Sequence, residues 1–364
     1  LLRIPIRAGK YLDALDVFYA HYIKTKNQFY LFTVNLTHLL SVLLNLGAVP
    51  LVHQIIHSDE KKKVPMLKVN ALTRGYSIAV FWSPYFISVG LVLANFPISW
   101  IEIFPIGITL SIIGVFAGYF LEKRNKEELP IELLFTPVEK NGQTDIKTAW
   151  RKISSLIIIA LIITAAIFTL EWVTEIKIIA IITLVSIVTS IIWTIGVANF
   201  KTYKKEFSIY FNENLPSMKN EVVVFISAGF LGQSFISVGG SEWLLSVVEF
   251  FNLQEVFLLI PAILFVTFLL SFIGLHPIVS LTAFSMSFGS ADVFADSYRV
   301  LGVALIAAWG MSVMISPFSG ITLLTSSLTK KSSFHIGKAN LLFTGIMVVI
   351  LIVLLDILHY GFGY

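Results

Sequence analysis

Long apolar runs separated by short polar segments dominate this sequence. Runs without any Asp, Glu, Lys or Arg cover residues 76–101, 153–170, 178–200 and 300–329. A run of about 18 or more such residues is long enough to cross a lipid bilayer as a helix. The pattern predicts an all-α polytopic membrane protein, because a soluble core does not require so many full-length apolar runs.

Composition agrees with this class and excludes several others. Of the 364 residues, 56% are hydrophobic and 13% are charged, whereas soluble domains carry about 25% charged residues. The chain has no cysteine, which excludes disulfides, thiolate metal sites and cysteine catalysis. No zinc motif, phosphate loop or nucleophile elbow occurs, so we do not expect an enzyme. The formal charge of +4 is expected to orient membrane loops rather than to bind nucleic acid.

Basic residues cluster in a few segments. Residues 1–28 hold five Lys or Arg, 57–75 five, 121–152 seven, 200–221 four and 329–338 three. By the positive-inside rule, we expect the last four to be cytoplasmic loops of an integral protein in a bacterial cytoplasmic membrane, with membrane lipid as a partner. The amphipathic segment 1–28 is expected to lie at the interface as an arm.

The apolar segment 29–57 does not fit a single crossing. Its two flanks are both basic, and its 29 residues are too many for one straight crossing and too few for two. A re-entrant hairpin that turns near Asn45–Pro50 leaves both flanks on the cytoplasmic side. We expect a broken helix at 76–98 and a helix at 99–121 to complete this unit. A cytoplasmic linker at 122–152 and scaffold helices over 153–241 would follow.

The second half repeats this order. Over 242–358 we expect an arm at 243–251, a hairpin at 253–289 turning near Gly274–Pro277, a broken helix at 300–328 and a helix at 339–358. The flanks of the second hairpin are poor in Lys and Arg, so it would enter from outside. Ser-Pro followed by an aromatic residue interrupts both broken helices, as "SPYF" and "SPFS". Two matched units of opposite orientation predict an inverted-repeat transporter, whose discontinuous helices mark the binding site. Alternatively, Pro and Gly merely kink ordinary membrane helices.

The order of hairpin, Ser-Pro-broken helix and straight helix resembles the ion transporter superfamily, and in architecture the divalent anion:sodium symporter family. The resemblance covers roughly residues 11–121 and 222–358. It implies elevator-like motion, a homodimer and scaffold helices before residue 1. Residue 1 is Leu, so we expect the sequence to begin inside a longer chain. The family's hairpin tips carry Ser-Asn-Thr motifs for carboxylate and sodium, whereas these tips read "NLGAVP" and "GLHP".

The expected core segments, 29–57, 75–101, 257–290 and 300–329, contain no Asp, Glu, Lys or Arg. A neutral core with helix N-termini suits an anion, which hydroxyl and amide groups can orient. The substrate-binding candidates are Asn45, Gly47, Pro50, Ser83, Ser88, Gly274, His276, Pro277, Ser316, Ser319 and Thr322. Ser280 and Thr282 are weaker additions.

Some residues, inside and outside this set, also have structural interpretations. His276 could donate to a carboxylate or take a coupling proton, or it could be a buried structural histidine. We expect structural or interfacial roles for His38 and His53. Arg74 is expected to anchor at the membrane edge, with attraction of anions as the alternative. Further expectations are an external ion cluster of Asp292, Asp296 and Arg299, and helix packing by Gly114 and Gly118.

These patterns favour a secondary active transporter of a small anion, an organic carboxylate, that works by alternating access coupled to a cation. We expect no cofactor apart from a coupling Na⁺ or H⁺. A cation/proton antiporter of the same superfamily is an alternative, although a core without carboxylates argues against it. A membrane sensor or enzyme on a transporter-like fold is another alternative.

Overall fold

The computed structural model describes the chain except for residues 57–63, 126–128, 135–144, 175, 177 and 218. Throughout the described residues the regular structure is helical, and none of it is strand. Lys61–Lys63, in the first predicted basic loop, lie outside the described residues, as does much of the predicted linker.

The N-terminal part is a succession of helices with one 3₁₀ turn. They are α1 (Arg3–Ala8), α2 (Tyr11–Tyr22), α3 (Lys26–Leu44), the 3₁₀ turn η1 (Asn45–Gly47), α4 (Ala48–Ile55), α5 (Met66–Val80), α6 (Ile87–Asn95) and α7 (Trp100–Arg124). Only one 3₁₀ turn separates α3 from α4, and only a short interruption separates α5 from α6.

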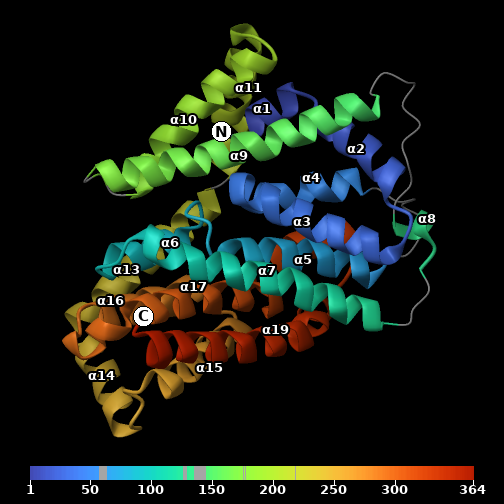
Figure 1. Cartoon of the computed structure of the whole chain (residues 1–364). Helices are drawn as coiled ribbons and strands as arrows, with labels where there is room; N and C mark the ends of the chain where they lie inside the picture. The colour runs from blue at the N-terminus through green and yellow to red at the C-terminus, as the bar shows by residue number, and fades with distance from the viewer. Residues whose placement is uncertain (57–63, 126–128, 135–144, 175, 177, 218) are drawn as a thin grey trace.

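The middle part continues with further helices. They are α8 (Ile131–Leu134), α9 (Ile146–Val173), α10 (Ile178–Val197), α11 (Phe200–Ile209), the π-helical turn η2 (Tyr210–Asn214), α12 (Leu215–Ser217) and α13 (Lys219–Ser237). In Figure 1, α9, α10 and α11 form a layer beside the bundle of the other long helices. α9 packs on α2, and α10 packs on α1.

The C-terminal part has a similar order of helices, but its first 3₁₀ segment lies at a different place from that of the N-terminal part. It consists of α14 (Gly240–Phe250), α15 (Val256–Phe272), α16 (Pro277–Gly289), the 3₁₀ segment η3 (Asp292–Ser297), α17 (Tyr298–Ile315), α18 (Gly320–Thr329), α19 (Ser333–Asp356) and the π-helical turn η4 (Ile357–Gly361). A short turn joins α15 to α16, and an interruption separates α17 from α18.

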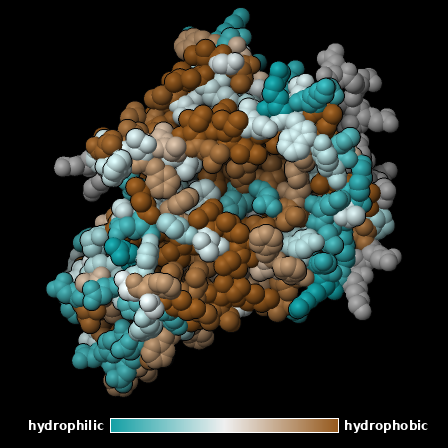
Figure 2. Space-filling view, viewed as in Figure 1, coloured by the Kyte–Doolittle hydropathy of each residue, from teal (hydrophilic) through white to brown (hydrophobic). Residues whose placement is uncertain are grey.

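The chain is an all-α polytopic membrane protein. Six helical segments of the described residues are long and apolar enough to cross a bilayer: Lys26–Ile55, Trp100–Arg124, Ile146–Val173, Ile178–Val197, Asp292–Thr329 and Ser333–Gly361. Figure 2 shows hydrophobic residues over the middle of one face, with hydrophilic residues gathered near the ends of α2 and α7 and around α14. An apolar belt between hydrophilic ends is the surface that a bilayer requires.

The two helices that precede the interruptions form the centre of the bundle. Every residue of α5 from Leu67 to Val80 is buried, and so is every residue of α17 from Val300 to Ile315. Gly310 of α17 lets the two helices approach closely, because a Cβ there would lie 2.9 Å from the carbonyl oxygen of Ser77 in α5.

Two segments that we predicted as loops are helical. α5 begins at Met66, so residues 66–75 are helix, buried from Leu67 on, rather than part of a basic loop. The segment 200–221 contains α11, η2, α12 and the start of α13. An apolar run read from sequence ends at a charged residue. Lys68 and Arg74 are buried within α5, so its N-terminal half did not read as part of an apolar helix.

Candidate functional site

The first interruption lies between α5 and α6. Pro84 has no amide hydrogen and so cannot continue the helix. The carbonyl groups around the interruption are held by α7: the Ser111 hydroxyl donates to Ile78 O at 2.6 Å, and the Trp100 indole donates to Trp82 O at 2.8 Å. Packing against α7 therefore satisfies backbone groups that a continuous helix would have paired internally.

The second interruption, between α17 and α18, is held by its own hydroxyl groups. Ser319 caps α18 by accepting from the Thr322 amide at 3.2 Å. Thr322 Oγ1 donates to Ser316 O at 2.6 Å, and Ser316 Oγ donates to Ser271 O of α15 at 2.7 Å. Thus Ser316, Ser319 and Thr322 come together as predicted residues, but each hydroxyl already has a protein partner.

Each interruption is also approached closely by the straight helix that follows it. A Cβ at Gly107 of α7 would lie 2.4 Å from Phe81 O, and a Cβ at Gly337 of α19 would lie 2.2 Å from Ile315 O. In both places only glycine permits this contact between a helix and the carbonyl at the end of its broken neighbour. The two halves of the chain thus share a detail of packing as well as an order of elements.

The turn between α3 and α4 depends on Asn45 rather than on Gly47. Asn45 has φ +52°, while Gly47 has an ordinary helical φ of −62° and open space around its Cβ position. Asn45 Oδ1 accepts from the Leu46 amide at 2.7 Å and from the Tyr76 hydroxyl at 3.0 Å. Pro50 lies in the first turn of α4, where proline is tolerated.

The turn between α15 and α16 requires its glycine. Gly274 has φ +94°, a conformation that side chains oppose. His276 caps α16, because its Nδ1 accepts from the Ile278 amide at 3.2 Å, and Pro277 occupies the first helical position. The imidazole also packs edge-on against the Trp309 ring of α17 at 5.5 Å. His276 therefore has a structural capping role in this conformation.

A chain of contacts joins both turns to both interruptions. Tyr76, which bonds Asn45 of the first turn, packs against Phe86 of the first interruption at 5.5 Å between ring centroids. A Cβ at Gly320, which begins α18, would lie 3.5 Å from the Leu46 side chain. A Cβ at Gly274 of the second turn would lie 3.7 Å from Phe318. The N-termini of α4, α6, α16 and α18 therefore lie in one contiguous region.

Two hydroxyl groups of the first interruption have no partner. Ser83 and Ser88 are fully buried, and neither Oγ has a hydrogen-bond partner among the described residues. The buried hydroxyls of Ser77 and Tyr85 are in the same state. A buried hydroxyl without a partner is unfavourable by about 1–3 kcal/mol. Sequence reasoning missed Tyr85 and Ser77 among these four donors, which can bind a ligand. Buried hydroxyls without a partner also occur at Ser41 of α3, Ser271 of α15 and Thr325 of α18.

The weaker candidates are engaged elsewhere. Ser280 Oγ donates to Pro277 O at 3.0 Å and Thr282 Oγ1 to Ile278 O at 2.7 Å, within their own helix. His38 accepts from the Trp82 indole at 3.0 Å and so supports the first interruption, which agrees with a structural role. Gly114 and Gly118 lie at close helix contacts, against Ile78 and Tyr30 respectively, which confirms their packing role.

The expectation for Arg74 was wrong. Rather than anchoring at the membrane edge, it is buried and donates to Glu122 of α7 at 2.8 Å and to Asn340 of α19 at 3.0 Å. Asn70 also donates to Glu122 at 2.8 Å, and the guanidinium lies over the Phe343 ring. The carboxylate that neutralises Arg74 is 48 positions away in sequence, so local patterns do not reveal it.

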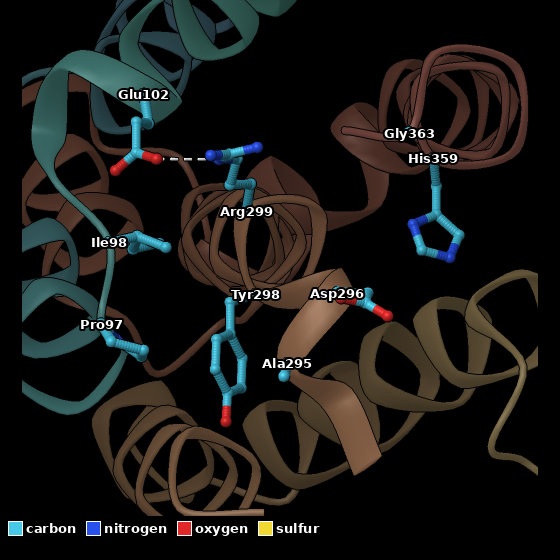
Figure 3. Close-up of a pocket in the computed structure, with 9 residues that line it drawn as sticks. All are labelled: Pro97, Ile98, Glu102, Ala295, Asp296, Tyr298, Arg299, His359 and Gly363. Atoms are coloured by element: carbon cyan, nitrogen blue, oxygen red, sulfur yellow. Dashed lines mark hydrogen bonds and ion pairs between the residues drawn. The ribbon is translucent and has the colours of Figure 1, made fainter. Parts of the chain in front are cut away.

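The prediction of an external ion cluster was also wrong about which residues pair. Arg299 pairs with Glu102 of α7 at 2.9 Å, and within the described residues neither Asp292 nor Asp296 forms an ion pair with it. Figure 3 shows Arg299 and Glu102 beside an open cavity of about 470 Å³, which Asp296 and His359 also line. This cavity lies where α7 and α17 begin and α19 ends, away from the two turns.

No protein-family model matches the chain, and a search of curated proteins finds no significant relative.

Proposed function

We propose that the protein is a secondary active transporter of a small anion, an organic carboxylate, that works by alternating access coupled to a cation. The observation that carries this proposal is the pair of interrupted helices, buried at the centre of a membrane protein and linked to two helical turns by contacts. Irregular backbone at membrane depth is tolerated where it is enclosed by protein or lines a cavity, and transporters use it to bind their substrates.

The chemistry of the region favours an anion. Four helix N-termini lie there, and each carries about half a positive charge. His276 and Ser319 each cap one amide, of α16 and α18 respectively. The unpartnered hydroxyls of Ser83 and Ser88 can donate to a carboxylate. Glu122, the buried carboxylate described above, is held by Arg74 and Asn70 rather than by this region.

The matched order of elements supports an inverted repeat with two re-entrant hairpins. In this proposal α3–α4 and α15–α16 are the hairpins, α5–α6 and α17–α18 the broken helices, and α7 and α19 the straight helices. The glycine contacts of Gly107 and Gly337 are equivalent under this correspondence. The positive-inside rule would place the first hairpin on the cytoplasmic side and the second on the external side.

The two interruptions would have different roles. The second is closed by its own hydrogen bonds, which makes it a rigid support. Around the first, four buried hydroxyls have no partner among the described residues, and around the second two have none, those of Ser271 and Thr325, so the ligand would bind mainly at the first. The resemblance to the divalent anion:sodium symporter family, including a homodimer and elevator-like motion, stays a proposal, because the tips lack the family's Ser-Asn-Thr motif.

A cation/proton antiporter remains a second candidate because of one observation. Glu122 is a buried carboxylate that the sequence argument did not place in the core, and intramembrane carboxylates carry protons in such antiporters. Its bonds to Arg74 and Asn70 favour a structural role in this conformation.

Uptake into proteoliposomes tests the proposal. We expect radiolabelled mono- or dicarboxylates to accumulate under a sodium or proton gradient. In the Ser83→Ala/Ser88→Ala double variant KM should rise about tenfold or more, since a hydrogen bond to a charged group contributes about 1.5–3 kcal/mol.

The Ser237→Ala/Ser246→Ala double variant is a matched control. Both of these hydroxyls are exposed and bond their own helices, so its KM should not change. Cation-driven pH changes without any anion requirement would instead support the antiporter.

A further inference from the structure

The helix α11, at the edge of the molecule beyond α10 (Figure 1), combines aromatic rings with basic side chains. Rings of Phe200, Tyr203, Phe207 and Phe211 follow one another along α11 and into the adjoining turn η2, at centroid distances of 6.3, 5.7 and 6.3 Å. Tyr203 is buried, whereas the three Phe side chains are substantially exposed. The three exposed phenylalanine rings leave apolar surface on both sides of the buried Tyr203 that is not covered by the described residues.

Basic residues lie on the same helix beside that aromatic row. Lys201, Lys204 and Lys205 are all exposed. At 100° per residue, they occupy the sector directly next to the row, with Lys204 closest to it. The one acidic residue of α11, Glu206, is held by Arg7 of the neighbouring helix α1 at 3.7 Å. The exposed lysines therefore form a cationic strip without a compensating carboxylate on their own helix.

The position of α11 suggests what covers this surface. The apolar span α10 ends at Val197, and α11 begins three residues later, after an Asn199 cap that accepts from the Thr202 amide at 2.8 Å. A helix starting where a span ends meets the headgroup layer of the bilayer. There, aromatic rings insert at the boundary with the acyl chains, and lysines extend toward anionic headgroups.

We propose that α11 is a binding surface for anionic phospholipids. Phe200, Phe207 and Phe211 would contact the upper acyl chains, and Lys201, Lys204 and Lys205 would bind the phosphate groups. This inference does not depend on what the protein transports, because it uses only the composition of α11 and its place after α10.

Selective quenching in bilayers of defined composition tests this inference. The chain has no cysteine, so a Ser208→Cys variant can carry a single bimane label. Ser208 is exposed, and at 100° per residue it lies in the same sector of α11 as Lys201 and Lys204. The full chain is reconstituted into phosphatidylcholine bilayers that contain a minor share of phosphatidylglycerol, with bromine on the acyl chains of one lipid or the other. We expect brominated phosphatidylglycerol to quench the label several-fold more strongly than its share of the bilayer predicts.

The Lys201→Gln/Lys204→Gln/Lys205→Gln variant should lose this preference, since each basic residue near an anionic surface contributes about a five-fold gain in binding. A control that replaces Lys123, Lys147 and Lys338, which are exposed lysines on other helices, by Gln should keep it. Equal quenching by the two lipids in the parent protein would overturn the proposal, as would a preference that survives loss of the three α11 lysines. Protection of the label from both brominated lipids would also overturn it, by showing that another protein surface, such as a second copy of this chain, covers α11.

Discussion

At the scale of single residues, the two glycines of the predicted site differ in the backbone that each adopts. Gly274 has φ +94°, whereas Gly47 lies in the ordinary helical region with open space at its Cβ position. Gly274→Ala should lower the free energy of unfolding by about 1–2 kcal/mol, the cost of a side chain in a left-handed conformation. Gly47→Ala should leave it nearly unchanged. Thermal unfolding in detergent compares the two, and equal losses would contradict the turn geometry described above.

The serines of the two interruptions should respond oppositely to alanine. Ser319→Ala removes a helix cap and should destabilise the protein by about 1 kcal/mol. Ser83→Ala removes a buried hydroxyl that has no partner, so stability should stay the same or rise. The same unfolding assay measures both variants. If Ser83→Ala is as destabilising as Ser319→Ala, the Ser83 hydroxyl has a protein partner in the resting state and is not free for a ligand.

At the scale of elements, a buried polar network ties α5 to three other helices. Arg74 of α5 contacts Glu122 of α7, Asn340 of α19 and, through its guanidinium, the Tyr30 ring of α3. Removing one partner of a buried ion pair leaves an uncompensated charge, so Arg74→Met should destabilise by about 3–5 kcal/mol.

The double variant Arg74→Met/Glu122→Gln should recover most of this loss, because neither charge is then left alone. A double-mutant cycle on the unfolding free energy measures the coupling. Single-variant losses that simply add would show that the two side chains do not interact.

The helix α5 illustrates which features could be predicted from the sequence and which could not. The Ser-Pro pairs located both interruptions, because proline cannot donate an amide hydrogen bond and the neighbouring residues are uncharged. The start of α5 at Met66 was missed, because Arg74 was treated as a membrane boundary. Its pairing with Glu122 and the bond from Tyr76 to Asn45 are set by tertiary packing between distant segments. A single sequence carries no local signal for such contacts.

At the scale of the whole molecule, the interrupted helices occupy the middle of the bundle, and α9 and α10 form a layer beside it (Figure 1). The bundle contains both sets of elements that we propose to be related by inverted symmetry. Alternating access would then require that this bundle presents its ligand-binding region first to one side and then to the other. That motion depends on hairpins that enter the membrane from opposite faces.

Sidedness of single-cysteine variants tests this architecture most directly, because the chain has no cysteine of its own. We predict that cysteines at Lys24 and Lys62, which flank the first hairpin, react with an impermeant maleimide from the cytoplasmic side only. Cysteines at the exposed residues Phe251 and Val293, which flank the second hairpin, should react from the external side only. Labelling of Lys24→Cys and Lys62→Cys from opposite sides would show that residues 26–55 cross the membrane, and would contradict the inverted hairpins on which the proposed transport site depends.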